Sequence, residues 1–241
     1  SFVYVLNDII DKDLDKYHYR KKYRPIPNGD ISVEYAIFIG SIALSIGLVF
    51  GWLLGASIFL IILFYIFNNI LYSFFLKKLP IIDVFSISLG FILRMMSGVY
   101  VIGDLPTTWI TICTMFLALF LGFSKRFAEK ISIKNNNHFN QRFVLTNYKN
   151  KDLISLVNET SFGSVLSYAL STTVSGKNPA LIITIPIVYY AITYYKFALF
   201  NGKLGEEPET TILKDKTIQV CIVLWLIMIV LIIYHNPQFF L

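Results

Sequence analysis

The sequence predicts an all-α, polytopic membrane protein in which several apolar helices cross the bilayer as one transmembrane bundle. Of the 241 residues, 56% are hydrophobic and only 15% are charged, whereas soluble domains usually carry about 25% charged residues. Several apolar runs approach or exceed the roughly 20 residues that a helix needs to cross a hydrocarbon core about 30 Å thick. These runs cover residues 35–50, 53–75, 84–102, 109–123, 179–199 and 220–234.

Polar segments between these runs divide the chain into seven predicted spans and the end of an eighth helix at residues 1–6. The predicted spans are 32–50, 53–75, 83–102, 107–124, 153–174, 179–200 and 215–234. The first segment is too short to cross a bilayer and the sequence begins without Met, so we expect that N-terminal helices are missing from it. We expect residues 1–241 to form a single transmembrane domain.

Long polar loops and short turns alternate along the chain. The predicted loops are 7–31, 76–82, 125–152 and 201–214, and the turns lie near residues 51, 104 and 176, the first of them from Gly51 to Gly55. Because each span changes sides, all the long loops share one face of the membrane. They hold nearly all the Lys and Arg, so the positive-inside rule puts them in the cytoplasm. We therefore expect a multi-pass protein of the cell membrane whose active site faces the cytoplasm.

An acidic stripe, NDIIDKDLD at residues 7–15, is the strongest functional signal. On a helix, three of its aspartates share an arc of about 60°, with Asn7 beside them and Asp13 on the opposite side. These three are Asp8, Asp11 and Asp15. Mg²⁺ prefers a few carboxylates together with waters and phosphate oxygens. The stripe therefore predicts a magnesium site, although a solvated acidic face is the alternative.

A basic cluster follows in the same loop, just before the segment PIPNG. Its members are Lys16, His18, Arg20, Lys21, Lys22 and Arg24. Arg offers a planar fork and Lys a point charge to phosphate oxygens that a metal does not bind. Taken alone, the cluster is explained equally well by attraction to anionic lipid. Its proximity to the aspartates favours diphosphate binding by Lys21, Lys22 and Arg24.

Several motifs together resemble a known family of membrane enzymes. NDIIDKDLD followed by RPIPNG resembles the first motif of the UbiA superfamily of membrane prenyltransferases, and YSFFLKK at residues 72–78 is similar to a second segment of that superfamily. The branch that transfers phosphoribose to polyprenyl phosphate is similar in three later places. These are Asp83 with GFILR and Ser97-Gly98, GFSKRFAE at 122–129, and the stretch from Gly205 through Glu209 to Asp215.

The resemblance covers essentially the whole chain and implies a UbiA-type bundle, which has nine helices in that branch. It implies transfer of 5-phosphoribose from 5-phosphoribosyl 1-diphosphate to a decaprenyl-like polyprenyl phosphate, with Mg²⁺ as cofactor. Asp8, Asp11 and Asp15 would be catalytic, and with Asn7 would hold the metal. The implied substrate-binding residues are Asn7, Lys21, Lys22, Arg24, Tyr72, Lys77, Asp83, Arg94, Lys125, Arg126 and Glu129.

One departure from the superfamily lies in the predicted loop 125–152. Ordinary aromatic prenyltransferases carry a second aspartate-rich motif there, whereas this chain has Lys125, Arg126 and Glu129. This replacement predicts direct contact between the loop and phosphate. A salt bridge at a helix end, worth only about 0.3–0.5 kcal/mol, is the alternative.

Arg94 lies about midway along its predicted span, where an unpaired arginine costs roughly 2.5–3.5 kcal/mol even on a lenient insertion scale. We therefore expect it to face a polar interior. It could lie near the same cavity as Asp83, bind a lipid phosphate, or form a structural pair with another helix. The acidic segment Glu206, Glu207 and Glu209 with Asp215 could close the mouth or hold a cation, but a solvated face explains it almost equally well.

Two other functions stay open at this point. A conventional UbiA-type prenyltransferase would join an isoprenyl diphosphate to an aromatic or lipid acceptor. A transporter would carry charged residues across the bilayer, whereas here they gather at one side. We expect the membrane, the polyprenyl phosphate and the phosphoribosyl diphosphate as partners and no nucleic acid, and the sequence is compatible with a homo-oligomer.

Overall fold

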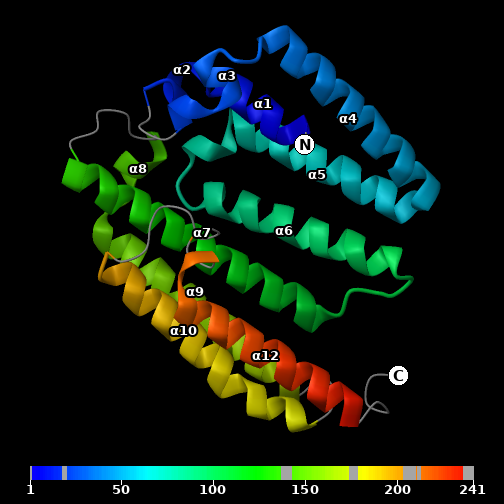
Figure 1. Ribbon diagram of the computed structural model, residues 1–241, viewed down its shortest axis with the longest axis vertical. Helices are drawn as coiled ribbons and strands as arrows, with labels where there is room; N and C mark the ends of the chain where they lie inside the picture. Colours follow the sequence, from blue (N-terminus) through cyan, green and yellow to red (C-terminus); the bar gives the residue numbers. More distant parts are fainter. Residues whose placement is uncertain are drawn as a thin grey trace. The chain divides into compact units, whose positions relative to one another are not determined.

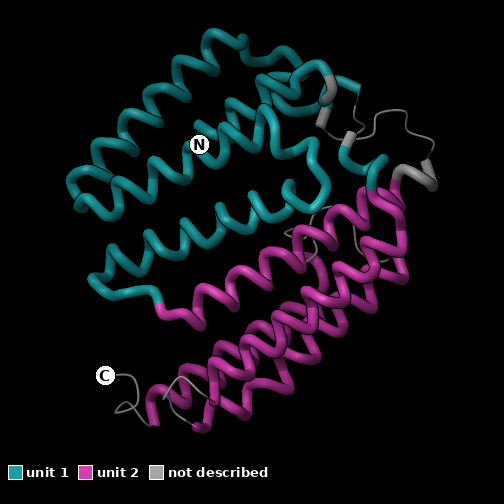
Figure 2. Tube along the Cα trace, turned by 180° about the vertical axis from the view of Figure 1, so that it is seen from behind, with its two compact units in different colours: residues 1–106, 138–147 teal, residues 107–137, 148–241 magenta. Residues whose placement is uncertain are grey.

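The described part of the chain is helical and contains no strand, as the sequence predicts. The structure is a computed structural model and describes residues 2–17, 21–136, 143–173, 179–202, 210 and 213–235. Figure 2 shows two compact units, Ser1–Pro106 with His138–Asn147, and Thr107–Asn137 with Tyr148–Leu241. Each unit is held together by its own helix packing.

The first unit combines short helices with three long ones. The short elements are α1 (Phe2–Ile10), α2 (Lys12–Asp15), η1 (Lys21–Tyr23), α3 (Pro25–Asn28), η2 (Leu76–Lys78) and α8 (Phe143–Asn147). The long helices are α4 (Val33–Leu54), α5 (Ala56–Phe74) and α6 (Ile82–Val101). Helices α4, α5 and α6 lie side by side in chain order, and α1 packs against α4 and α5 (Figure 1).

The turn between α4 and α5 is shorter than the predicted segment from Gly51 to Gly55. Only Gly55 separates the two helices, and its φ of 124° is a conformation that favours glycine. Gly51 is instead a buried residue of α4, where an added Cβ would lie 2.5 Å from Cδ1 of Ile62 on α5. The prediction of a turn at Gly51 is therefore wrong, because this glycine allows close helix packing rather than a change of direction.

The second unit contains α7 (Thr108–Asn136), α9 (Asn150–Thr173), η3 (Pro179–Thr184), α10 (Ile185–Phe200) and α12 (Lys216–His235). Helix α9 packs along α7, and α10 packs against α9 and α12. The predicted span 179–200 begins as a 3₁₀ helix, and its α-helical part starts next to Pro186, which has no backbone N–H to donate. Asp215 caps α12, since its Oδ1 accepts from the backbone N of Thr217 at 2.9 Å.

The predicted loop 125–152 is wrong over its first half, because α7 continues to Asn136. Hydropathy marks where a helix leaves the apolar layer, and it does not mark where the helix ends. Beyond the apolar part, Phe127 and Ala128 are still buried, and the ring of Phe127 packs edge-on against Phe200. Lys125, Arg126 and Glu129 therefore lie on a helix and not in a loop.

In the described part of the chain, six helices are long and apolar enough to cross a membrane, which makes this an integral membrane protein. They are Val33–Leu54, Ala56–Phe74, Ile82–Val101, Thr108–Ser132, Pro179–Phe200 and Lys216–His235. Their large apolar side chains are widely exposed, as expected for contact with lipid; Trp52 is 69% exposed.

The remaining predicted span, 153–174, corresponds to the helix α9 (Asn150–Thr173), which is long enough to cross a membrane but is less apolar than the other six. It carries buried hydroxyl side chains that bond to its own backbone, such as Ser164 Oγ to the carbonyl of Thr160 at 2.8 Å. Such bonds satisfy polar groups within the helix itself. The count of seven spans stays a prediction.

Candidate active site

The aspartates of the acidic stripe lie on one continuous helical path through α1 and α2. The backbone N of Asp11 donates to the carbonyl of Asn7 at 2.9 Å, and that of Asp15 donates to the carbonyl of Asp11 at 2.8 Å. Helical hydrogen bonding therefore continues across Asp11, which lies between the two assigned helices. Asp8 and Asp11 are half-buried and Asp15 is buried, whereas the Asp13 side chain is 91% exposed. The predicted common face of the three aspartates is confirmed.

Among the described residues, two cations from other segments pair with this stripe. Arg24 Nη1 lies 2.6 Å from Oδ1 of Asp8 and 3.4 Å from Oδ2 of Asp15. Lys77, on η2, places Nζ 2.6 Å from Oδ1 of Asp11. The first unit thus brings three aspartates and two cations together from three separate stretches of sequence. The two contacts of 2.6 Å, from Arg24 to Asp8 and from Lys77 to Asp11, are short enough for strong charge-assisted hydrogen bonds.

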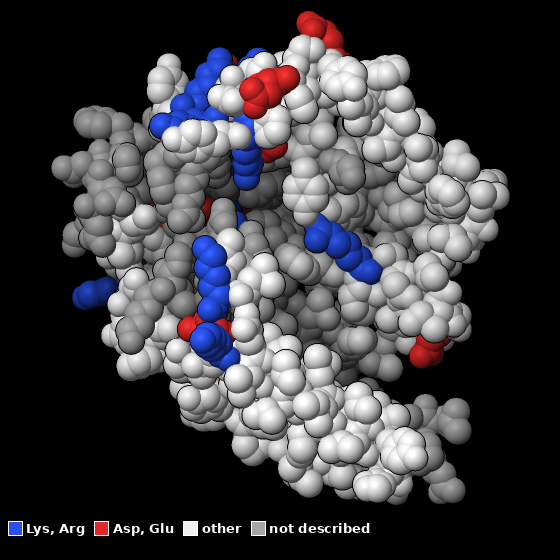
Figure 3. Space-filling view, in the orientation of Figure 1, with Lys and Arg blue, Asp and Glu red and all other residues white. Residues whose placement is uncertain are grey.

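Lys22, a further member of the basic cluster, pairs with none of the three aspartates in the described part of the chain. The Lys22 side chain is exposed and lies over the ring of its neighbour Tyr23, 5.0 Å from the centroid. The Lys21 side chain, with His18 and Arg20, lies outside the described residues. On the face shown in Figure 3, one group of charged side chains lies over α2 and α3, and other charged side chains are spread over a mostly uncharged surface.

Asn7 supplies the observation that tests whether these residues suit a metal. Its Oδ1 is buried and has no hydrogen-bond partner among the residues that the structure describes, which is unusual for a buried polar atom. Among the described side chains, no group of three or more His, Cys, Asp or Glu is arranged to hold a metal. Mg²⁺ usually binds one or two carboxylates and completes its shell with water and substrate phosphate. The oxygens present therefore fit Mg²⁺ bound together with a substrate, and not a metal cage formed by protein alone.

Tyr72 and Asp83 lie on either side of η2. Tyr72 is half-buried in the last turn of α5, and Asp83 is fully buried in the first turn of α6. Just before α6, Ile81 has a φ of 70°, a strained conformation for a β-branched residue. This strained connection links the segment that carries Lys77 to the buried Asp83.

Arg94 is exposed on α6 and forms no ion pair with any described residue. Its Nη2 donates to the hydroxyl of Tyr65 at 2.7 Å and to that of Tyr4 at 3.4 Å. The sequence allowed a structural pair between Arg94 and another helix. Partners on other helices are present, but they are tyrosine hydroxyls and not carboxylates. The sequence argument missed Tyr4 and Tyr65, although Tyr4 lies one helical turn before Asp8 and on the same face.

Lys125, Arg126 and Glu129 belong to the second unit. Arg126 is 1% exposed, and its Nη1 lies 2.8 Å from Oε2 of Glu129, three residues further along α7. This is the salt bridge that the sequence offered as the alternative to phosphate binding. Lys125 is half-buried and forms no ion pair with a described residue. A role for the three in phosphate binding stays a prediction.

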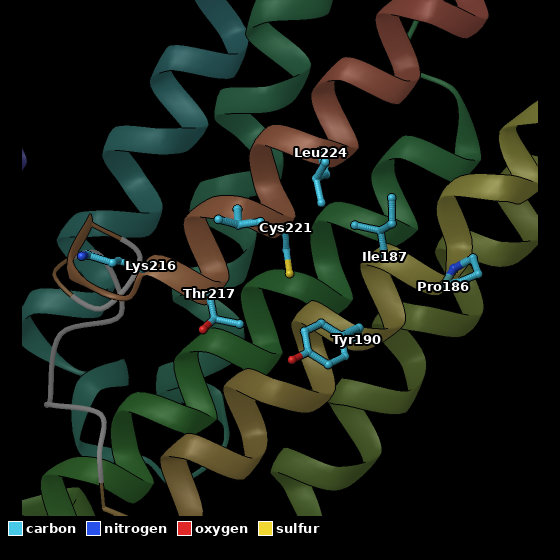
Figure 4. A pocket seen from close by; sticks show the side chains of 8 residues that line it. Pro186, Ile187, Tyr190, Lys216, Thr217, Cys221 and Leu224 are labelled. Carbon is cyan, nitrogen blue, oxygen red and sulfur yellow. The ribbon is translucent and has the colours of Figure 1, made fainter.

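An apolar pocket of about 550 Å³ lies between α10 and α12 of the second unit. Figure 4 shows Tyr190 and Thr217 among its mostly apolar lining, with the Lys216 side chain directed away from Tyr190. None of the predicted site residues lines this pocket. The candidate active site is therefore the aspartate stripe with its cations and not this pocket.

The membrane-spanning helices make this an integral membrane protein. Its candidate active site is a charged one, in which the aspartates of α1 and α2 face Arg24 and Lys77. The sequence profile of the UbiA prenyltransferase family matches residues 1–135, and the chain belongs to this family. A decaprenyl-phosphate phosphoribosyltransferase of Corynebacterium glutamicum is 31% identical over 99% of this chain and 74% of its own length. A protein of the same name from Mycolicibacterium smegmatis is 26% identical over 94% of this chain and 74% of its own length.

Solved structures share the fold. A UbiA homologue from Archaeoglobus fulgidus bound to GPP and Mg²⁺ superposes with a TM-score of 0.69 at 19% identity, over 98% of this chain and 82% of that one. The same homologue bound to DMAPP and Mg²⁺ gives a TM-score of 0.70 at 18% identity, over 97% and 83%. The predicted all-α, UbiA-type fold is confirmed.

Proposed function

We propose that this chain transfers 5-phosphoribose from 5-phosphoribosyl 1-diphosphate to a polyprenyl phosphate and releases diphosphate, with Mg²⁺. The observation that carries the proposal is the aspartate stripe, with Arg24 and Lys77 each 2.6 Å from one of its carboxylates. Relatives named decaprenyl-phosphate phosphoribosyltransferase, which match nearly the whole chain, support the choice of substrates.

In the proposed reaction, an oxygen of the lipid phosphate attacks the anomeric carbon of the donor. The bond from that carbon to the diphosphate oxygen breaks, and diphosphate leaves with the electron pair. A phosphomonoester is already ionised near neutral pH, so the nucleophile needs no general base. The protein contributes by holding the two substrates in position and by balancing charge on the leaving group.

The stripe and its two cations have complementary tasks in this proposal. Asn7, Asp8, Asp11 and Asp15 would hold Mg²⁺, which when bound neutralises negative charge on the diphosphate. Arg24 and Lys77 would exchange their carboxylate partners for phosphate oxygens as the donor enters. Both cations are therefore bound close to the stripe before a substrate arrives, which limits the cost of ordering them.

Replacing Asp11 tests the proposal. Asp11→Ala should lower turnover by about 100-fold or more, the loss typical of one essential electrostatic group. Purified protein would be incubated with labelled phosphoribosyl diphosphate, polyprenyl phosphate and Mg²⁺, and the lipid product would be identified by mass spectrometry. Asp13→Ala, on the exposed opposite side of the same helical segment, is the matched control and should keep wild-type activity. Equal, Mg²⁺-dependent activity of the two variants would remove the metal role from Asp11.

A conventional prenyltransferase is the second candidate, because the matched solved structures carry GPP or DMAPP with Mg²⁺. A digeranylgeranylglyceryl phosphate synthase from Pyrococcus horikoshii is also 37% identical, over 35% of this chain and 30% of its own length. In that reaction the lipid is the diphosphate electrophile, whereas in the proposed one it is the phosphate nucleophile. Transfer of label from an isoprenyl diphosphate, with none from phosphoribosyl diphosphate, would favour this alternative.

A further inference from the structure

Arg94 is a positive charge in the middle of a membrane-spanning helix. It lies twelve residues beyond Ile82, the first residue of α6, or about 18 Å along the helix axis. Its side chain is exposed on the first unit and has no carboxylate partner among the described residues. A charge at this depth is costly and usually marks a functional site, so an anion is expected beside it.

The groups around Arg94 orient its guanidinium without neutralising it. Tyr65 from α5 accepts one hydrogen bond, Tyr4 from α1 accepts another, and the rings of Tyr65 and Phe91 each lie 5.1 Å from the guanidinium carbon. Both hydrogen bonds come from Nη2, and Nη1 and Nε bond to no described residue. A phenol that accepts a bond can still donate its own proton. The cluster therefore presents donors and a net positive charge.

The cluster also continues the aspartate stripe into the membrane. Tyr4 precedes Asp8 by four residues, so it shares the face of α1 that carries Asp8, about 6 Å further along the axis. The stripe with Arg24 and Lys77 contains both signs of charge, as a metal and a diphosphate require. The Arg94 cluster contains only positive charge, which suits an anion without a metal.

We propose that Arg94, with Tyr4 and Tyr65, binds a phosphomonoester group of a substrate at a site separate from the metal and the diphosphate. This inference rests on the proposed function, in which two such groups occur. One is the phosphate of the polyprenyl acceptor, and the other is the 5-phosphate of the donor. Both are dianionic near neutral pH and suit the planar fork of an arginine.

The test compares Arg94→Gln and Arg94→Lys with Lys78→Gln, a variant that removes an exposed lysine outside the proposed site. Dissociation constants would be measured on the full chain in nanodiscs without turnover, separately for phosphoribosyl diphosphate with Mg²⁺ and for polyprenyl phosphate. Arg94→Gln should weaken one of the two by about tenfold or more, the typical effect of losing a charge-assisted hydrogen bond. The affinity of Arg94→Lys should lie between those of wild type and Arg94→Gln, because lysine keeps the positive charge but lacks the planar guanidinium.

The two arms identify the source of the phosphate. If only the affinity for phosphoribosyl diphosphate falls, Arg94 binds the 5-phosphate of the donor. If only the affinity for polyprenyl phosphate falls, Arg94 binds the lipid phosphate. If both affinities equal those of Lys78→Gln, the inference is overturned. Tyr65→Phe keeps the ring and removes only the hydroxyl. A loss of affinity for the same substrate, smaller than that expected for Arg94→Gln, therefore supports the site even where Arg94→Gln folds poorly. A wild-type chain that binds polyprenyl phosphate but not phosphoribosyl diphosphate would contradict the proposed function, and the lipid arm would still decide this inference.

Discussion

Asp11 and Lys77 stand 66 residues apart in the sequence and form one of the two shortest ion pairs described in the chain. Their side chains are 17% and 16% exposed, so neither is freely solvated. A partly buried carboxylate without a counter-charge is unfavourable, and removing one partner usually costs more than the pair contributes. In this structure Lys77 and Arg24 thus balance the charge that Mg²⁺ would balance in the proposed reaction.

Removing Lys77 should make the protein more dependent on Mg²⁺ for its stability. Lys77→Gln leaves Asp11 without its cation, so we expect a loss of about 1–3 kcal/mol in Mg²⁺-free buffer. Added Mg²⁺ should then raise the unfolding temperature of the variant more than that of wild type, because it binds the folded state more tightly. Thermal unfolding with and without Mg²⁺ measures this, and Lys78→Gln should respond like wild type. If Mg²⁺ raised the unfolding temperatures of Lys77→Gln and wild type equally, the idea that Mg²⁺ takes the place of Lys77 beside Asp11 would be contradicted.

The aspartate face was predictable from sequence because helical periodicity is local. The choice of cations was not, because the pairing of Arg24 rather than Lys22 depends on how the chain turns through η1 and into α3. Lys77 could be singled out only through the family resemblance. Tyr4 carried a local signal, its four-residue spacing from Asp8, which an argument restricted to charged residues passes over.

At the scale of elements, hydropathy placed most long helices within a few residues and failed where helices leave the apolar layer. It ended α7 near residue 124, whereas the helix continues to Asn136. It also gave no information on the contact between α7 and α9, which depends on a glycine. An added Cβ at Gly163 of α9 would lie 2.6 and 2.9 Å from two ring carbons of Phe116 on α7.

Gly163→Ala should therefore destabilise the second unit. The new methyl group displaces the Phe116 ring, and overpacking of this kind typically costs about 1–3 kcal/mol. Gly47→Ala on α4 is the matched control, since an added Cβ there meets nothing within 4 Å. Thermal unfolding followed with a thiol-reactive dye would use the two free cysteines, Cys113 and Cys221. Equal unfolding temperatures for the two variants would contradict the close approach of α7 and α9.

At the scale of the whole molecule, the main remaining prediction is its orientation in the membrane. The long polar segments are expected in the cytoplasm because they hold most of the positive charge. The acidic stripe precedes α4, and the short turn that contains Asp104 follows α6, so an odd number of spans separates the two. They should therefore lie on opposite faces of the membrane.

Cysteine labelling tests this orientation in a variant without the native cysteines. A membrane-impermeant reagent applied to intact cells should label Asp104→Cys and leave Asp13→Cys unlabelled. Both positions are exposed in the structure, so accessibility alone does not separate them. Permeabilised cells, in which both should react, provide the control. Labelling of Asp13→Cys in intact cells would place the candidate active site on the outer face.

The central claim is that the aspartate stripe binds a divalent metal together with a diphosphate. The most direct measurement is a crystal structure of the full chain with Mn²⁺ and phosphoribosyl diphosphate, using anomalous diffraction to locate the metal. We expect the anomalous peak to place Mn²⁺ within bonding distance of oxygens of Asp8 or Asp11 and of the diphosphate. Arg24 and Lys77 should then contact phosphate oxygens. A metal bound away from the stripe, or a donor bound with both ion pairs intact, would contradict the account.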